Sequence, residues 1–522
     1  MSKPLKRRAS SPKYVSPSQT VLVGFESPFL QKLDPNNRWI VLSQRIPWDK
    51  IVSKYNRQMS GSSEGRPPLS GRIVVGALLI KHLNNWDDRE TILQIQENMY
   101  LQYFVGYDTF TTSPIFDPSL FVEIRKRLTD TVLNNINEEI VKLYLMPPPK
   151  PVDAPQDDST KDENPPTSSS ITVDNVSTEV THHGRMITDA TACPQDIAYP
   201  TDLNLLSESR AQTECFIDKL YEGIITGKDK PRTYRQKARK EYLKVAKNKN
   251  KSRKVIRKAI GKQLNYLKRN LKNINLLLDL YQDQGKDFPL TFKQQRYLLV
   301  IETLYNQQRQ MHSTKTHSVE DRIVSIHQPH IRPIPRGKAN AKVEFGAKIE
   351  VTLFNGFAFM DQLSWDAFHE GNRLVYYVEK WKERFGYYPK EVLADGLFST
   401  RENRKIFKEL GIKLIAKPLG RPSLTAVKQY VRPGERNPIE GKFGQGKNAY
   451  GLGRIKARLK DTSQSWIASI ILVLNLVKLA GLNSYCLICS KHERNILQNR
   501  AILQLIINTN ALFRPSLNKA FH

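Results

Sequence analysis

The residues VEFGAKIEVTLFNGFAFMDQL, at positions 343–363, indicate which class of fold this chain adopts. Apolar and polar residues alternate through 343–354 and again through 357–363, which is the two-residue period of β-strands. Asn355-Gly356 separates the two runs and is a dipeptide typical of tight hairpin turns. We therefore predict two antiparallel strands joined by this turn.

The segments on either side of this hairpin predict a mixed α/β domain. After it, 366–384 and 401–410 have helical patterns, and 391–394 and 412–416 are short apolar runs typical of buried strands. Before it, a strand-like run covers 185–188. Together these elements predict a mixed sheet of about five strands with helices packed against it.

A strongly basic helical segment stands between the first strand and the hairpin. Residues 228–272 contain 19 Lys or Arg against Asp229 and Glu241, with apolar residues at helical spacing. A solvated helical face is the simplest interpretation of a charge run. At this density we favour contact with phosphate groups, because neutralising them releases counterions. The candidate phosphate-binding residues here are Arg253, Lys254, Arg257 and Lys258.

The ends of the chain and the region before the sheet have other patterns. Residues 1–20 are predicted to be a disordered basic arm, 147–170 a proline-rich linker, and 483–522 a C-terminal tail. Helix-start signals recur through 21–146, including Asp87 with Glu90 three residues later. Short helices joined by turns are typical of a helix-turn-helix-like DNA-binding domain, and equally of a plain helical packing domain.

Composition narrows the class of partner. The chain has 522 residues, 39% of them hydrophobic, and a net charge of +30, which indicates a folded protein with a polyanionic partner, first of all nucleic acid. Four cysteines are too few for a disulfide framework of this size, which favours a reducing compartment. The most apolar segment, 466–482, is interrupted by Asn475 and Lys478, so we predict a buried core helix and no membrane partner.

Three acidic residues are candidates for chemistry because of where they stand. Asp189 and Asp395 each follow an apolar strand-like run, and Glu440 begins a predicted helix after Asn437-Pro438. Carboxylates at the ends of neighbouring strands reach the same sheet edge, and grouped hard oxygen ligands suit Mg²⁺. Each also has a structural alternative: an Asp after a strand often forms a turn or caps a helix. Glu440 in turn occupies a capping-box position behind Asn437.

The surroundings of Glu440 favour a functional interpretation. Arg436 lies four residues before it and Lys447 seven after it, offsets that place both cations on its helix face. Glycines crowd the same stretch and disfavour a helix, which close approach of a DNA backbone would explain. They are Gly441, Gly444, Gly446, Gly451 and Gly453.

These residues carry a resemblance to a known family. The block RNPIEGKFGQGK, 436–447, is similar to the signature of Arg, three residues, the catalytic Glu, six residues and Lys in DDE transposases of bacterial insertion sequences. The chain resembles their InsH-like (insertion-sequence-five) group, with Asp189-Ala190-Thr191 and Ala394-Asp395-Gly396 at the two aspartate sites. Pro433 departs from the Tyr of the broader signature, and Gly396 stands where Lys is frequent.

The resemblance implies a fold and a reaction. It implies an α/β ribonuclease-H-like catalytic core at 171–482 with a basic helical insertion at about 203–310, after an all-α N-terminal DNA-binding domain at 21–146. Asp189, Asp395 and Glu440 would hold two Mg²⁺ ions, with Mn²⁺ able to substitute, for DNA cleavage and strand transfer. Arg436, Lys442 and Lys447 would contact DNA.

The resemblance also implies partners and leaves alternatives open. The expected partners are the terminal inverted repeats and target DNA, bound by a homodimer in the bacterial cytoplasm at the nucleoid. A catalytically inactive DNA-binding protein and a ribonuclease-H-like nuclease or resolvase remain alternatives. Cys486-x-x-Cys489 with His492, and His327-x-x-His330, are weak zinc patterns for which we favour idle thiols and a loop pair.

Overall fold

The computed structural model describes residues 14–16, 29, 32–59, 69–145, 181–223, 229–335, 343–417 and 434–481. The predicted linker at 147–170, the predicted tail at 483–522 with Cys486, Cys489 and His492, and Pro433 lie outside these ranges, as does most of the predicted arm at 1–20.

The described residues form one six-stranded mixed sheet, ordered β2-β3-β1-β5-β6 with β4 also paired to β3. The long strands are β1 (Arg185–Pro194), β3 (Val343–Phe354) and β4 (Phe357–Ser364), and the short ones are β2 (Arg332–Pro335), β5 (Glu391–Leu393) and β6 (Lys413–Ile415). β1 pairs antiparallel with β3, whereas β1, β5 and β6 run parallel. This arrangement is consistent with a ribonuclease-H-like core.

The predicted hairpin is confirmed, and two strand predictions need correction. Asn355 and Gly356 both have positive φ, 47° and 76°, as the twist of a two-residue hairpin turn requires. The extra strand beyond the predicted five is β2, which contains two prolines and pairs only with β3. β1 continues to Pro194 rather than ending near residue 188, because β3 pairs with it from Ile187 to Pro194.

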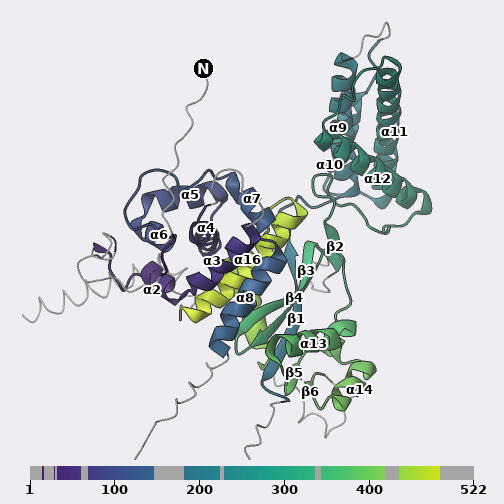
Figure 1. Ribbon diagram of the computed structural model, residues 1–522. Coiled ribbons are helices and arrows are strands. Elements are labelled where there is room, and N and C mark those ends of the chain that lie inside the picture. The colour runs from purple at the N-terminus through teal and green to yellow at the C-terminus, as the bar shows by residue number, and fades with distance from the viewer. Residues whose placement is uncertain are drawn as a thin grey trace, which may run out of the picture.

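Two helical layers enclose the sheet (Figure 1). One face packs against α16 (Lys460–Leu479), which α8 (Asp130–Leu145) and the earlier helices cover in turn. The other face packs against α13 (Leu374–Phe385) and α14 (Arg401–Glu409). The helix that the sequence predicts over 366–384 is α13, which begins only at Leu374, after a short 3-10 helix at Gly371–Arg373.

The N-terminal helices share a hydrophobic core with the sheet. They are α2 (Arg38–Arg45), α3 (Trp48–Met59), α4 (Gly71–Asn84), α5 (Asp88–Glu97), α6 (Met99–Phe104), α7 (Leu120–Arg127) and α8. Asp87 caps α5 by accepting from the Glu90 N–H, as its spacing predicts. Lys81 and Arg125 both pair with Asp88, and both cations lie over the ring of Trp466 on α16. The helices α2 to α8 and α16 are thus packed together as one unit.

The apolar helix α16 is a core helix, as the sequence predicts. By length and composition it could cross a membrane, yet 83% of its apolar window is buried inside the protein. The polar residue in this window has a structural role: the Asn475 amide accepts from the Ala358 N–H and donates to Ala358 O and Asn137 Oδ1. Lys478 lies at the exposed end, over the ring of Phe357.

Replacing Asn475 by Ala should destabilise the protein by about 2–4 kcal/mol, because it leaves buried polar partners on β4 and α8 without a hydrogen bond. Urea denaturation measures the change, and Asn265→Ala, at an exposed position on a helix, is the matched control. A loss no greater than that of the control would show that this network contributes nothing to stability.

Four helices between β1 and β2 form a separate unit with its own hydrophobic core. They are α9 (Asp202–Glu222), α10 (Arg235–Ala246), α11 (Arg253–Asp283) and α12 (Phe292–Thr314). Figure 1 shows this helical unit standing beyond the β2 end of the sheet, away from β5 and β6. The remaining helix, α15 (Asn437–Ala449), contacts β1 and α16.

Candidate active site

Strand register brings Asp189 and Asp395 to the same level of the sheet. Ile187 of β1 pairs with Leu393 of β5, and each aspartate lies two residues further along its chain. Because side chains alternate between faces with a period of two, both carboxylates leave the sheet on one side. Asp395 follows the end of its strand as predicted, whereas Asp189 lies within β1 and beyond the paired part of β5.

Arg436 joins the two aspartates through its guanidinium group. One terminal nitrogen lies 2.9 Å from Asp189 Oδ2, and the other lies 3.4 Å from Asp395 Oδ1. The Arg436 and Asp189 side chains are 18% and 20% exposed, while that of Asp395 is 54% exposed. The site is therefore a half-buried carboxylate, an accessible carboxylate and a shared cation that balances them.

Burial controls the ionisation of Asp189. It raises the pKa of this carboxyl to about 6, because the charged form loses hydration, and the nearby acids Glu370 and Asp395 raise it as well. The Arg436 guanidinium and the Ala190 N–H, which donates to Asp189 Oδ1 at 2.9 Å, oppose that rise in pKa. Negative charge at this position is costly unless a cation accompanies it.

Asp395 also has the structural role that its sequence position suggested, in addition to its contact with Arg436. Its side chain accepts from the Gly396 N–H at 2.6 Å and caps the short 3-10 helix η2 (Gly396–Phe398). The cap and the contact with Arg436 both use Asp395 Oδ1, so the carboxylate can still accept a further ligand. Asp395 is thus held in position by its own backbone and remains exposed.

Glu440 lies on α15, four residues after Arg436, and is exposed. Its predicted capping-box alternative is wrong: the helix begins at Asn437, its N-cap is Arg436, and no side chain caps it. Residues four apart share a helix face, so Glu440 projects from the same side as Arg436. Glu440 is not gathered with the two aspartates in this structure, because the described residues contain no group of three His, Cys, Asp or Glu close enough to enclose a metal ion.

The predicted basic residues of α15 differ in their surroundings. Lys447 is half-buried near the end of the helix. Lys442 turns toward α16, where its Nζ lies 3.4 Å from Leu474 O, and burial beside Lys478 lowers its pKa to about 8. The structure therefore places Lys442 at a helix contact rather than beside the aspartates.

Close packing explains one of the α15 glycines, so approach of a DNA backbone is not the reason for all of them. A Cβ on Gly446 would come within 3.1 Å of Leu452, so this glycine lets the helix pack closely. Gly441 and Gly444 face open space and have no such reason. Gly451, with φ of 81°, is required by its own backbone conformation.

The other predicted residues lie away from the aspartates. Arg253, Lys254, Arg257 and Lys258 begin α11 in the helical unit. Arg257 donates to His312 O, while the other three are exposed. His327 and His330 face different neighbours, the former Tyr297 and Glu208 and the latter Trp365, so they form no zinc pair.

Sequence reasoning missed the acids beneath the site. Glu350 of β3 is fully buried, accepts from the Thr188 hydroxyl at 2.7 Å, and has a pKa raised well above its ordinary value by burial. Glu370 pairs with Lys348 at 2.6 Å. The alternation of 343–354 predicts a strand but gives no sign that Glu350 is buried, because the helices that cover both faces of β3 come from other segments. An acid on a strand flanked by helical segments was the available signal.

Two carboxylates fit a divalent cation at this site. Their oxygen atoms are the ligands that Mg²⁺ prefers, and the raised pKa of Asp189 shows that this position favours an accompanying positive charge. Arg436 supplies that charge here. A third protein ligand would have to come from a residue such as Glu440 on the same face of α15 as Arg436.

Comparisons with known proteins find two related segments in this chain. Residues 27–127 match the family described as Transposase domain (DUF772), and residues 392–477 match the family described as Transposase DDE domain. A Rhizobium meliloti protein described as uncharacterized protein ORF8 in nfe locus is 28% identical over 116 residues, 22% of this chain and 54% of that protein. The match thus spans about half the length of that relative, and no solved structure matches. Two segments of the chain are thus similar to transposase domains, and the second of them, 392–477, includes Asp395, Arg436 and Glu440.

Proposed function

We propose that this protein is a transposase of the InsH-like group that binds the ends of an insertion sequence and catalyses metal-dependent DNA strand cleavage and strand transfer. The observation that carries the proposal is the Arg436 guanidinium between Asp189 and Asp395, with Glu440 one turn further along the helix. Asp189 lies within β1 and Asp395 follows β5, while Arg436 is the N-cap of α15 and Glu440 lies in its first turn. All but Asp189 fall inside residues 392–477, which match the DDE domain.

The proposed roles follow from the position and charge of each side chain. Asp189, Asp395 and Glu440 are the metal-binding catalytic residues, and the bound Mg²⁺ would activate the attacking hydroxyl and stabilise the leaving oxygen. When DNA binds, Arg436 exchanges the aspartates for a DNA phosphate, because a guanidinium forms bidentate hydrogen bonds with a carboxylate or with a phosphate. Lys447 adds positive charge on the same helix. Base readout belongs to the N-terminal helices.

Assembly and location are part of the proposal. Transposition joins two DNA ends, so we propose a homodimer that holds one end with each protomer, in the bacterial cytoplasm at the nucleoid. The partner is double-stranded DNA, at the terminal inverted repeats and at the target. The net charge of +30 supports a polyanionic partner.

The test is to incubate the purified full chain with Mg²⁺ and a duplex that carries the DNA flanking its gene. The proposal expects nicks at the element ends, joined products with target DNA, and loss of both in EDTA. Binding without cleavage would support the inactive DNA-binding alternative. Cleavage of branched duplexes without any joining would support the nuclease or resolvase alternative.

A further inference from the structure

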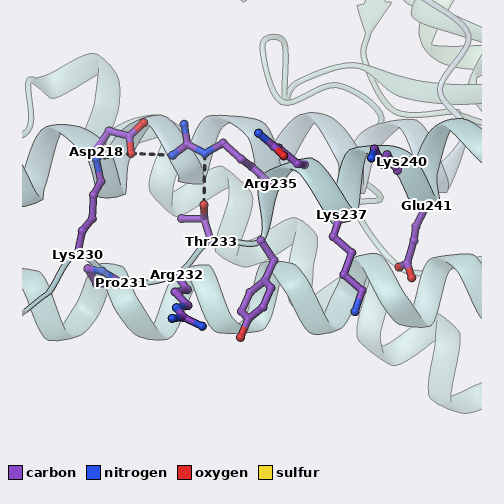
Figure 2. Close-up of a pocket in the computed structure, with 11 residues that line it drawn as sticks. Asp218, Lys230, Pro231, Arg232, Thr233, Arg235, Lys237, Lys240 and Glu241 are labelled. Atoms are coloured by element: carbon purple, nitrogen blue, oxygen red, sulfur yellow. Dashed lines mark hydrogen bonds and ion pairs between the residues drawn. The ribbon is translucent and has the colours of Figure 1, made fainter.

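A concave surface lies where the chain enters α10. We call it the basic hollow and define it by its cations, Lys230, Arg232, Arg235, Lys237 and Lys240. Asp218 of α9 and Glu241 are the two acidic residues that line it. Figure 2 shows Lys230 and Arg235 close to Asp218, with Arg232 and Lys237 extending to the opposite side of the segment.

Both carboxylates of the basic hollow are already paired. Asp218 lies 2.9 Å from Lys230 and 2.7 Å from Arg235. Glu241 lies 2.8 Å from Lys262, which comes from α11.

Three further cations of the hollow form no ion pair with a carboxylate among the described residues, although Lys237 lies near enough to Glu241 to help lower its pKa. They are Arg232, Lys237 and Lys240, and all three are exposed. Exposed cations that line one surface repel one another, so an anionic ligand bound here reduces that repulsion as well as adding contacts.

An aromatic group accompanies these cations. Tyr234 also lines the hollow, is 44% exposed, and has a guanidinium over its ring, that of Arg269 at 4.6 Å. A phenol beside cations offers a flat face and a hydroxyl to the sugars of a nucleic acid backbone, in addition to the charges that meet phosphates.

The basic hollow is separate from the candidate active site. It belongs to the helical unit, which stands at the β2 end of the sheet, whereas Asp395 follows β5 at the other end (Figure 1). Its five cations suit the row of negative charges that a phosphodiester backbone presents. Residues 253, 254 and 258, at the exposed start of α11, extend the positive surface beyond it.

We propose that the basic hollow binds the phosphate backbone of double-stranded DNA, as a second contact that holds the duplex independently of the carboxylate site. The inference rests on the proposed function only in taking DNA as the polyanion. Phosphate contacts do not read sequence, so this contact adds affinity to any duplex and positions the one being cut.

The test measures binding of a fluorescent duplex of arbitrary sequence across a range of KCl concentrations. EDTA is present throughout, so that no cleavage occurs. The variant replaces Arg232, Lys237 and Lys240 by Gln. Each lost phosphate contact removes about 0.9 from the slope of log affinity against log salt. We expect the slope to fall by about 2 to 3, with far-UV circular dichroism unchanged.

A charge-matched variant controls for the loss of three positive charges anywhere on the helical unit. It replaces Lys293, Arg309 and Lys315, exposed on or next to α12, by Gln and should change the slope by less than about 1. Equal slopes for the two triple variants would overturn the proposal. The proposal would also be overturned if the variant at Arg232, Lys237 and Lys240 bound duplex DNA as tightly as the unmodified protein but bound single-stranded RNA more weakly. Because the assay measures binding and not cleavage, its result can be interpreted even if the protein does not catalyse strand cleavage.

Discussion

Asp189→Asn should make the protein more stable at neutral pH and abolish its cleavage activity. The folded-state pKa of about 6 lies above the ordinary value of 3.8, so between these values the folded chain binds more protons than the unfolded chain. The contribution of Asp189 to stability is therefore most favourable below pH 4 and is lost as the pH rises through 6. Asn cannot ionise, so at pH 7.5 we expect the variant to gain about 1–3 kcal/mol.

Urea unfolding in EDTA at pH 4.5 and pH 7.5 measures this effect. The gain at pH 4.5 should be only about a third of that at pH 7.5, because the folded carboxyl is almost fully protonated at the lower pH. Asp287→Asn, at an exposed position in the helical unit, is the control and should change stability at neither pH. A variant that is less stable than the unmodified protein at pH 7.5 would show that Asp189 is a structural residue. Cleavage should fall by at least about 10³-fold, since metal ligands contribute several kcal/mol to the barrier.

Arg436→Gln should have the opposite effect on stability. It removes the cation between two carboxylates, so the pKa of Asp189 rises further and its ionised form becomes costlier. We expect a loss of about 1–3 kcal/mol at pH 7.5 and a smaller loss at pH 5, where more of Asp189 is protonated. Urea unfolding at the two pH values measures it.

Arg436→Lys provides the matched comparison. Lysine keeps the positive charge but cannot reach both aspartates with two parallel nitrogens, so it should restore part of the lost stability. If Gln and Lys were equally destabilising at both pH values, shape rather than charge would explain the role of Arg436. If neither substitution changed the free energy of unfolding, the Arg436 guanidinium would not act as a counter-ion for the two aspartates.

Much of the fold could be predicted because local patterns and tertiary packing agree there. The hairpin at 343–363 has both strand alternation and a turn dipeptide, and the structure keeps it unchanged. The strand β2 was missed because its two prolines argue against a strand, although pairing with β3 alone tolerates them. The shared core of α16 and the N-terminal helices joins residues hundreds of positions apart, which no local pattern indicates.

The candidate site was predictable in composition but not in contacts. The sequence places Asp189 and Asp395 after apolar runs, and the register of β1 and β5 explains why they meet. It also places Arg436 near Glu440, but the ion pairs of Arg436 with both aspartates depend on how α15 packs against β1. Burial of Glu350 was unforeseen, because the helices on both sheet faces come from distant segments.

The most direct test of the account is strand transfer by the Glu440→Gln variant, because Glu440 is the proposed metal ligand with no structural role among the described contacts. Precleaved element ends, target DNA and Mg²⁺ are incubated with the unmodified protein, with Glu440→Gln, and with the control Glu409→Gln, whose exposed acid lies on α14. The account predicts joined products from the unmodified protein and the control, and at least about 10³-fold less from Glu440→Gln with DNA binding retained. Joining that survives this substitution would contradict it.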